Sequence, residues 1–412
     1  MRISVLGLGF VGLTTALGFA EKGFSVTGYD INKDRCSVIS DGKVPFYEPG
    51  LTGALARNLG KTFRLADNAK DAAYKSDICF FCVGTPGLPE GSADLTHLLS
   101  AIDSVLAVVP QACTLVVKST IPPGTLAEQI EPYIRGKGAN NPVAVNPEFL
   151  REGKCWDDFM NADRIVCGVT DDRAKRALEK VYAPFKTPLH FTEPNTAEFI
   201  KYLSNSLLAA LISFSNEMAL LADAIGGIET ARAFRVLHED RRLAGAEINA
   251  YLYPGCGFGG FCLPKDIAAL DAAARNRGFK PRILESVISL NNEMPEQAAS
   301  KIIGAAGERI KKIGILGLSF KPGSDDVRES PAAKIIAILL RRNYADLYAY
   351  DPLALREFQN AYGFSITYCA SARELCNTCG VVAIVTAWEE FKGINKVFPD
   401  THFIDCRYIL ES

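Results

Sequence analysis

Residues 2–12 read RISVLGLGFVG, and this stretch decides the fold of the first part of the chain. The short apolar run at 2–6 predicts a buried strand. Apolar residues at helical spacing over 14–22 predict a helix, which Gly23 ends. A second strand is predicted over 24–29. Strand, glycine turn, helix and strand in this order predict a β-α-β unit with parallel strands.

The glycines of this turn have the spacing of a dinucleotide-binding fingerprint. Gly7 permits the tight turn, Gly9 lets backbone N–H groups reach a pyrophosphate, and Gly12 allows close packing of helix on strand. Asp30 ends the second strand, where a carboxylate accepts from a ribose 2′-hydroxyl and repels a 2′-phosphate. We therefore predict NAD rather than NADP as cofactor. The alternative is an ordinary α/β turn that binds nothing.

Length and composition set the broad class. A chain of 412 residues predicts two or three domains, and a net charge of −2 predicts no general affinity for nucleic acid or anionic membranes. With no signal-peptide pattern and no apolar run near the roughly 20 residues of a membrane span, we expect a cytoplasmic protein. The 12 cysteines are expected to be reduced thiols. Neither CxxC pair has a second pair at zinc-site spacing, so no metal site is predicted.

The opening pattern recurs late in the chain. Residues 312–320 (KIGILGLSF) echo RISVLGLGF, and residues 345–351 (ADLYAYD) echo the second strand. A second β-α-β unit is therefore predicted from about residue 311, with its helix at 331–342. Ser319 replaces the second glycine, so this unit is expected to bind a different nucleotide or none. Further strands are predicted at 381–386 and 402–405.

A long helix is predicted between the two α/β units. Residues 196–224 carry little charge and no proline, which is typical of a buried helix that joins two domains. Lys201 and Asn205 lie four residues apart and so share one face of this helix. A lysine on an apolar face needs a partner, which could be an ion pair or a ligand.

One cysteine stands in an unusual setting. Residues 257–266 read GFGGFCLPKD, so Cys262 follows a glycine-rich approach. Glycines let the backbone pass close to a ligand. Lys265 raises the thiolate fraction of a nearby thiol, and Asp266 can position a water or carry a proton. An NAD enzyme with such a thiol can hold an aldehyde as a thiohemiacetal, oxidise it to a thioester and hydrolyse that to an acid.

Eight motifs occur in an order that resembles the UDP-glucose/GDP-mannose dehydrogenase family, from residue 1 to about 405. They are GLGFVG at 7–12 with Asp30, FYEPGL at 46–51, VGTP at 83–86, KSTIPPG at 118–124, NPEFLREG at 146–153, the Lys201/Asn205 helix, GFGGFCLPKD at 257–266, and LSFKP at 318–322 with Asp326 and RES at 328–330.

The resemblance implies the architecture of the whole chain. We expect an α/β protein with two Rossmann-like doubly wound parallel sheets, joined by a long central helix and a helical middle domain. The expected domains are an NAD-binding domain at 1–193, a helical dimerisation domain at 194–295 and a Rossmann-like domain for the substrate's nucleotide at 296–412. A homodimer is expected.

The resemblance also implies the reaction. The family oxidises the C6 alcohol of a nucleotide sugar to a carboxylate in one four-electron oxidation, which uses two NAD⁺ and one water. We expect conversion of UDP-glucose to UDP-glucuronate, and GDP-mannose or a UDP-N-acetylhexosamine remains an alternative. A two-electron dehydrogenase of the 6-phosphogluconate or 3-hydroxyacyl type would need neither Cys262 nor a second Rossmann unit. A sensor that binds without turnover would need no nucleophile.

Individual roles follow from the same resemblance. The catalytic residues are expected to be Cys262 as nucleophile, Lys201 and Asn205 as oxyanion donors, and Thr120, Glu148 and Asp266 around the proton and the water. The cofactor-binding residues are expected to be Gly7, Gly9, Phe10, Val11, Gly12, Asp30, Lys33, Thr85, Thr120, Glu152, Lys265 and Arg328. The substrate-binding residues are expected to be Glu148, Phe149, Leu150, Arg151, Glu152, Lys201, Asn205, Arg242, Tyr253, Gly257, Gly259 and Lys321. Which group takes the first proton stays open.

Some of these positions have alternatives. Arg328 could instead bridge to Asp325 or Asp326. Arg242 resembles an arginine that enters the partner subunit's site, and the neighbouring Arg241 could take that role. The segment from 242 to 262 is about four residues longer than in UDP-glucose members, and its YLYPG resembles GDP-mannose members. Phe261 stands where serine or tyrosine is usual, and we expect it to affect packing only.

Overall fold

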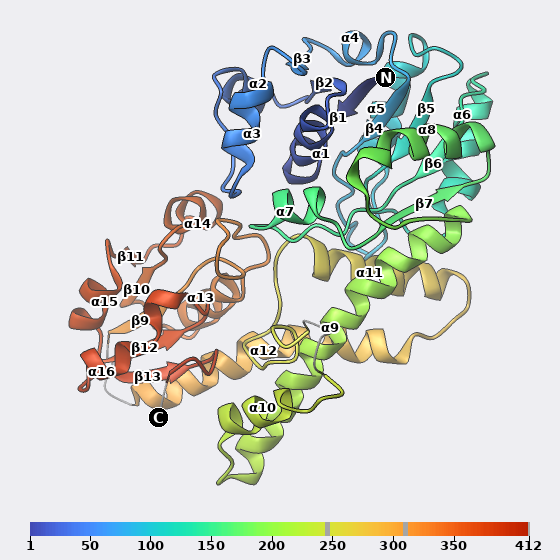
Figure 1. Ribbon diagram of the computed structural model, residues 1–412. Coiled ribbons are helices and arrows are strands. Elements are labelled where there is room, and N and C mark those ends of the chain that lie inside the picture. Colours follow the sequence, from blue (N-terminus) through green and yellow to red (C-terminus); the bar gives the residue numbers. More distant parts are fainter. Residues whose placement is uncertain (244–247, 308–311, 411–412) are drawn as a thin grey trace. The chain divides into compact units, whose positions relative to one another are not determined.

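The computed structural model describes residues 1–243, 248–307 and 312–410 (Figure 1). The predicted start of the second unit near residue 311 lies outside these ranges. The chain forms two compact units. The first comprises Met1–Leu203 and Ala272–Gly278, and the second comprises Ser204–Asp271 and the described residues from Phe279 on.

The first unit is built on an eight-stranded sheet with the strand order β3-β2-β1-β4-β5-β6-β7-β8. The order 3-2-1-4-5-6 is that of a dinucleotide-binding sheet. Only β6 and β7 pair antiparallel among the described strands, so the sheet is not parallel throughout as predicted. The strands are β1 (Arg2–Leu6), β2 (Ser25–Tyr29), β3 (Phe63–Leu65), β4 (Ile78–Phe81), β5 (Thr114–Val117), β6 (Val143–Val145), β7 (Ile165–Val169) and β8 (Leu189–Thr192).

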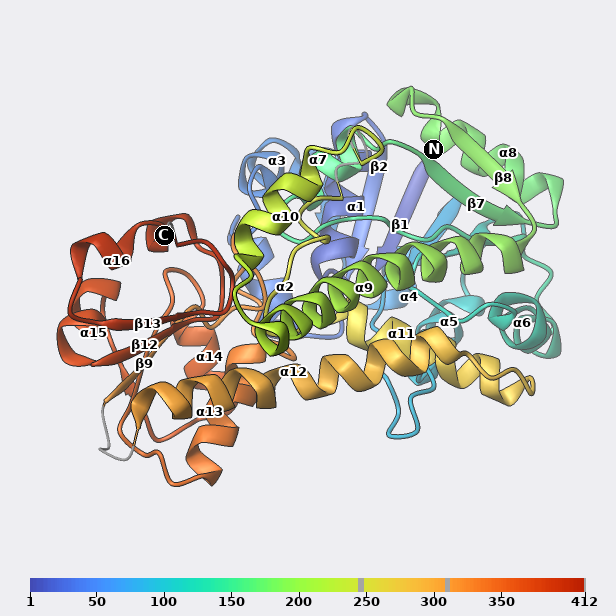
Figure 2. The ribbon, with the colours of Figure 1, turned by 90° about the horizontal axis from the view of Figure 1, so that it is seen from below.

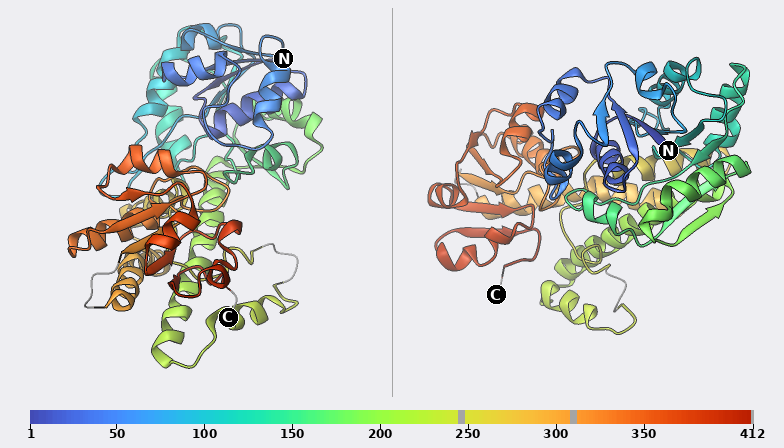
Figure 3. Two further views of the ribbon diagram at one scale, coloured as in Figure 1. Left: turned by 90° about the vertical axis from the view of Figure 1, so that its left-hand side faces the viewer. Right: turned by 45° about the horizontal axis from the view of Figure 1, so that its top comes forward.

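Helices cover both faces of this sheet (Figures 2 and 3). Alternate residues of β1, β4, β5, β6 and β7 enter two separate apolar clusters, as the period of two requires. The first cluster takes in α1 (Phe10–Glu21), α3 (Leu51–Asn58) and α8 (Asp172–Tyr182), and the second takes in α4 (Ala69–Ala73), α5 (Thr96–Leu106) and α6 (Glu131–Gly136). The remaining helices of this unit are α2 (Lys33–Ser40), η1 (Leu126–Ile130), α7 (Cys155–Met160) and η2 (Ala183–Phe185). Central strands buried on both sides explain the continuous apolar runs ICFF and TLVV.

The second unit contains a five-stranded sheet in which every neighbouring pair is parallel, in the order β11-β10-β9-β12-β13. Its strands are β9 (Ile313–Leu316), β10 (Leu347–Tyr350), β11 (Thr367–Tyr368), β12 (Val381–Ile384) and β13 (His402–Asp405). Its helices are α10 (Thr230–His238), α12 (Arg282–Ala306), α13 (Pro331–Arg341), α14 (Leu355–Tyr362), α15 (Ala372–Thr378), η3 (Glu389–Phe391) and α16 (Ile394–Val397). The predicted fold class, α/β with two doubly wound sheets and a long central helix, is confirmed.

Two helices run from one unit into the other. They are α9 (Pro194–Ile225) and α11 (Cys262–Asn276). Helix α9 is less buried than predicted, because Phe199, Leu203 and Leu207 on its outer side are about half exposed. Among the described helices it alone is long and apolar enough to cross a membrane, which corrects the expectation that the chain has no such stretch. A helix in the core of a globular protein can have the same length and apolar composition. Helix α9 buries Glu198, Lys201 and Asn205 against protein.

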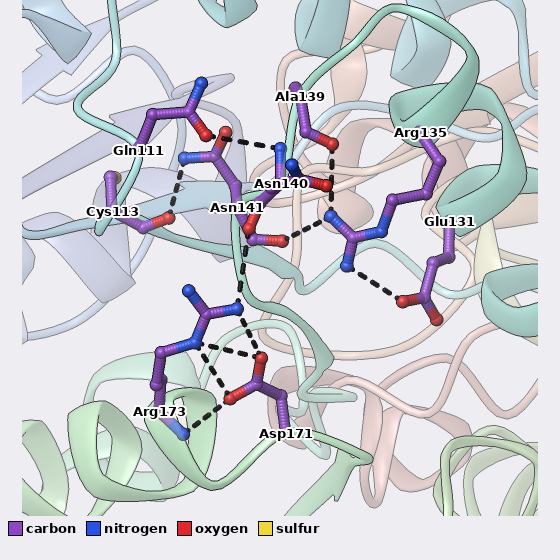
Figure 4. Close-up of polar contacts among 9 residues, drawn as sticks. All are labelled: Gln111, Cys113, Glu131, Arg135, Ala139, Asn140, Asn141, Asp171 and Arg173. Carbon is purple, nitrogen blue, oxygen red and sulfur yellow. Dashed lines mark hydrogen bonds and ion pairs between the residues drawn. The ribbon is translucent and has the colours of Figure 1, made fainter.

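A polar network closes the amino ends of β5 and β6 (Figure 4). Asn141 donates to the carbonyl oxygens of Pro110 and Cys113 at 2.8 and 3.0 Å. Arg135 donates to the carbonyls of Ala139 and Asn141, both at 3.1 Å. Because the loops with the predicted site residues follow the opposite, carboxyl ends of these strands, we regard this network as structural.

Candidate active site

The first glycine turn leaves room for a ligand. Gly7 adopts φ +87°, and its N–H donates to Tyr29 O at 2.9 Å. A Cβ atom on Gly12 would lie 1.7 Å from Gly7 O, whereas one on Gly9 would meet no atom within 4 Å. Gly9 is also the N-cap of α1 and has no side chain to pair with the first N–H groups. These backbone N–H groups are suited to bind a phosphate group, which is the role predicted for Phe10 and Val11.

Asp30 holds this turn together. Its buried carboxylate accepts from Leu8 N at 2.6 Å, from Asn32 N at 2.8 Å and from Arg35 Nη1 at 2.8 Å. The residue therefore braces the glycine turn from the end of β2, in addition to its predicted contact with a ribose. Lys33, a predicted cofactor contact, donates to Asp67 O at 3.1 Å.

The second glycine turn, at Gly317, has the same backbone geometry as the first, but its N–H groups already donate to acceptors within the protein. Gly317 N donates to Tyr350 O at 2.8 Å, as Gly7 N does to Tyr29 O. Asp351, the counterpart of Asp30, accepts from Leu318 N, Ser319 N, the Ser319 hydroxyl and Trp388 Nε1 through one oxygen alone. Helix α13 begins at Pro331, which has no N–H. The geometry agrees with the prediction that this turn holds no pyrophosphate in the manner of the first.

Two loops at the carboxyl ends of β4 and β5 are joined by hydroxyl groups. Thr85 Oγ1 donates to Thr120 O at 2.8 Å. Ser119 Oγ donates to Val83 O at 2.6 Å. The predicted contacts Thr85 and Thr120 thus lie together at the edge of the sheet where ligands of doubly wound folds bind.

Lys201 and Glu148 form a buried ion pair. Lys201 Nζ lies 2.9 Å from Glu148 Oε1, and the side chains are 5% and 7% exposed. Burial opposes ionisation of Glu148, but the charge and hydrogen bond of Lys201, the N–H of Leu150 and the charge of Lys118 outweigh it and lower its pKa. Of the two partners considered for Lys201, the ion pair is therefore present, and Glu148 is held as an acceptor.

The loop after Glu148 is anchored at both ends. Leu150 N donates to Glu148 Oε2 at 2.6 Å. Arg151 forms an ion pair with Asp158 at 2.6 Å. Gly153 N donates to Glu48 at 2.9 Å. Glu48 was not predicted as a site residue. It lies in the FYEPGL motif and connects that motif to the loop that carries Phe149 and Glu152.

Cys262 is the first residue of α11 and, of the twelve cysteines, the one classed as exposed. Asp266 lies one turn further along the helix and is buried. Its carboxylate accepts from Asn205 Nδ2 at 2.6 Å and pairs with Lys265 Nζ at 2.5 Å. A reachable thiol at a helix start, followed by a carboxylate fixed by two donors, is suited to nucleophilic attack and to positioning a water.

Phe261 has a larger role than the expected packing. Its ring lies 4.5 Å from the Arg328 guanidinium carbon and 5.5 Å from Lys265 Nζ, distances that permit cation–π attraction. Arg328 also pairs with Asp326 at 2.5 Å, so the bridge considered for it is present, and a ligand contact remains a prediction. Lys321 Nζ lies 5.5 Å from the Phe320 ring.

The glycines before Cys262 are packed closely against other parts of the same unit. A Cβ atom on Gly259 would lie 2.2 Å from Glu329 O. Gly257 adopts φ +98° beside Asn291, whose Oδ1 accepts from Phe258 N at 2.7 Å. Asn291, in α12, was not predicted, because no local pattern connects it to a loop 33 residues earlier.

The last two predicted substrate contacts lie away from the Cys262 loop in sequence. Arg242 is 88% exposed in its side chain and pairs with Asp240. Tyr253 donates its hydroxyl to Tyr408 O at 3.0 Å. Neither contact tests the predicted roles. Part of the long 242–262 segment lies outside the described residues.

The structure therefore brings the predicted residues together in two groups. Glu148, Phe149 and Lys201 meet in the first unit, and Asn205, Lys265 and Asp266 meet in the second. Helix α9 carries both Lys201 and Asn205. Within the described ranges, no three His, Cys, Asp or Glu side chains lie close enough to share a metal ion.

Comparison with known proteins identifies the family. Three family models of UDP-glucose/GDP-mannose dehydrogenases match in order, the NAD-binding domain at residues 1–186, the central domain at 195–293 and the UDP-binding domain at 314–412. The UDP-glucose 6-dehydrogenase of Haloferax volcanii is 36% identical over 97% of this chain and 94% of its own.

Solved structures give the same result. A UDP-glucose dehydrogenase of Pyrobaculum islandicum has a TM-score of 0.90 and 37% identity, over 99% of this chain and 94% of its own. A UDP-D-ManNAc dehydrogenase of Pyrococcus horikoshii has a TM-score of 0.86 and 29% identity, over 100% and 96%. The chain belongs to the UDP-glucose/GDP-mannose dehydrogenase family. The predicted class, an NAD-dependent nucleotide-sugar dehydrogenase, is thereby confirmed.

Proposed function

We propose that this chain oxidises the C6 alcohol of UDP-glucose to the carboxylate of UDP-glucuronate. The observation that carries the proposal is the exposed Cys262 thiol one helical turn before Asp266, whose carboxylate is buried and fixed by Asn205 and Lys265. The relatives named for UDP-glucose reach 36% and 37% identity, and the one named for UDP-D-ManNAc reaches 29%. That difference favours glucose among the possible sugars.

The cofactor fits the first glycine turn. The open space at Gly9 and the N–H groups at the start of α1 are suited to its diphosphate, and Asp30 to its adenosine ribose. When bound, NAD accepts the hydride that leaves C6, once in each of the two oxidation steps. Lys33, Thr85, Thr120, Glu152, Lys265 and Arg328 are proposed as further contacts.

Lys201 and Asn205 are proposed to donate to the C6 oxygen as negative charge develops on it. A fixed donor in a water-poor site lowers a barrier by about 3 kcal/mol. The proton of the C6 hydroxyl is proposed to pass to a base close to Glu148. The ion pair with Lys201 lowers the pKa of Glu148 and so keeps its carboxylate ionised. Thr120 is proposed to bind the water that relays the proton.

Cys262 is proposed to capture the aldehyde. Its sulfur bonds to C6 as the C6=O double bond opens, and the thiol proton passes to the C6 oxygen. The resulting thiohemiacetal cannot diffuse away between the two oxidations. Loss of the second hydride, together with transfer of the C6 hydroxyl proton to the neighbouring base, turns this adduct into a thioester. A water positioned by Asp266 then attacks the acyl carbon, the C–S bond breaks, and the carboxylate and the free thiol are released.

The sugar and its nucleotide are proposed to contact Phe149, Leu150, Arg151, Tyr253, Gly257, Gly259 and Lys321. A panel of UDP-glucose, GDP-mannose and UDP-N-acetylhexosamines with NAD⁺ tests the choice of substrate by the rate of NADH formation. Fastest turnover of UDP-glucose is the expected result. Fastest turnover of another sugar would contradict the substrate and leave the class standing.

A homodimer is proposed on the outer face of α9. Six large apolar residues there are exposed, namely Phe199, Leu203, Leu207, Phe214, Leu221 and Ile225. At 100° per residue all six lie within an arc of about 80°, which makes one apolar stripe that a second copy could cover. The exposed Arg242 would then be the residue offered to the partner's site. We place the enzyme in the cytoplasm, where its twelve cysteines, none of which is in a disulfide, would stay reduced. The molar mass in solution tests the dimer.

A further inference from the structure

Glu198 is a deeply buried carboxylate on the helix that carries Lys201, and it has no role in the proposed mechanism. It is 1% exposed and lies one turn before Lys201 on α9. Its Oε2 accepts from Gly124 N at 2.6 Å, and its Oε1 accepts from Leu126 N at 2.9 Å. Both oxygens therefore bind backbone N–H groups of one loop that is more than 70 residues away in sequence.

This loop carries Thr120, and Glu198 fixes its far end. The near end is held by the Thr85 hydroxyl on Thr120 O and by the Ser119 hydroxyl on Val83 O. The outer side of the turn is held by Arg277, which donates to Pro123 O at 3.4 Å and pairs with Glu128 at 2.9 Å.

We propose that Glu198 is a positioning residue, whose carboxylate sets the place of the Thr120 loop relative to Lys201. This inference rests on the proposed function. Thr120 and Lys201 are both expected to act on the C6 oxygen, so their separation must be correct. A misplacement of about 1 Å between reacting groups lowers a rate by about a hundredfold. Glu198 lies on the same helix as Lys201 and binds the loop of Thr120, so it is suited to prevent such a misplacement.

The chemistry of the two donors makes the carboxylate specific. Two N–H groups require two acceptor oxygens, and glutamate provides them at once. Glu198→Gln keeps the shape of the side chain but places an NH₂ group against one of the N–H donors. That end of the loop then loses one hydrogen bond and gains a repulsive contact, so it should shift away from α9.

The test compares Glu198→Gln with Asp405→Asn in the full-length protein. Asp405 also accepts two backbone N–H groups, from Arg407 at 3.0 Å and from Leu410 at 2.7 Å, but lies outside the proposed site. We expect Glu198→Gln to lower kcat at least tenfold with both KM values within about threefold. Amide hydrogen exchange should become faster at 124–126. Asp405→Asn should keep kcat within about twofold of the wild-type value, even if it lowers Tm as much as Glu198→Gln does.

Two outcomes overturn the proposal separately from the proposed function. If the wild type oxidises UDP-glucose and Glu198→Gln keeps its kcat, Glu198 does not position Thr120. If kcat falls equally in both variants with equal loss of Tm, the role of Glu198 is only structural. A wild type that oxidises no nucleotide sugar in the panel overturns the proposed function itself, and the positioning role with it.

Discussion

Lys201 Nζ lies 2.9 Å from Glu148 Oε1, and nearly all of both side chains is buried. An ion pair in such a place is expensive to desolvate and loses much stability when one partner is removed. Its presence in a largely apolar helix points to chemistry rather than to stability. We propose that the Lys201 ammonium supplies a donor for the oxyanion, and the same ammonium lowers the pKa of Glu148.

Replacing Lys201 should affect the rate more than the affinity. We expect Lys201→Ala to lower kcat by at least about a hundredfold, because a fixed oxyanion donor contributes about 3 kcal/mol. The KM for UDP-glucose should change far less. Steady-state kinetics measure both constants, and Tm shows whether the variant is folded. Equal losses in kcat and in affinity would reduce Lys201 to a binding contact.

Cys262→Ala should stop net turnover and leave binding nearly intact. The reason is that the thiohemiacetal cannot form, although the glycine turn and the ion pair remain. Isothermal titration measures NAD and UDP-glucose binding, and product analysis measures the acid. Cys376→Ala is a control, because this thiol lies in an apolar cluster of the same unit and is not among the proposed site residues. Acid formation at normal speed by Cys262→Ala would rule out the covalent step.

Asp30→Ala should weaken NAD binding and relax the discrimination against NADP. The carboxylate would no longer repel a 2′-phosphate, and Arg35, which pairs with Asp30 at 2.8 Å, would be free to bind one. The ratio of kcat/KM for NAD over NADP measures this effect. Asp351→Asn, in the second turn, should leave the ratio unchanged. An unaltered ratio in Asp30→Ala would show that Asp30 only braces the turn.

Glu198 should make stability depend on pH. Burial raises its pKa to about 7, against the opposing N–H groups of Leu126 and Gly124, and Glu128 adds to the rise. The same carboxyl has a pKa of 4.5 when exposed, so between pH 4.5 and about 7 the folded state holds more protons than the unfolded state. The stability that Glu198 contributes is therefore complete below pH 4.5 and is lost as pH rises through this window.

The variant Glu198→Gln does not titrate there. Its Tm relative to that of the wild type should rise between pH 5 and pH 7.5. Glu128 and Arg277, which flank the same turn, are present in both proteins and cancel in the difference. A Tm difference that is flat or falls with pH would show that Glu198 is ionised throughout this range.

Local patterns predicted the fold well. The strands at 2–6 and 402–405 agree with β1 and β13, and the helix at 331–342 agrees with α13 to one residue. These elements have strong apolar periodicity and clear glycine or proline boundaries. The antiparallel β7 was not predicted, because strand direction depends on a long connection and not on the composition of the strand.

The site was only partly visible in the sequence. Cys262 and Lys201 stand in recognisable motifs. Glu198 and Asn291 do not, and Glu48 stands in the FYEPGL motif without a local sign of its role, since each of these three side chains binds a loop that is 33 or more residues away. Their common feature is a buried acceptor that binds backbone N–H groups. The cation–π contacts of Phe261 were missed for the same reason, because Arg328 approaches from another segment.

We propose above all that one sulfur holds the sugar until four electrons have left it. This is tested by counting NADH formed per UDP-glucose consumed, with NAD⁺ in excess and the sugar limiting, and by identifying the product by mass. We expect two NADH per sugar and UDP-glucuronate as product, with no free aldehyde. One NADH per sugar with an aldehyde product would contradict it.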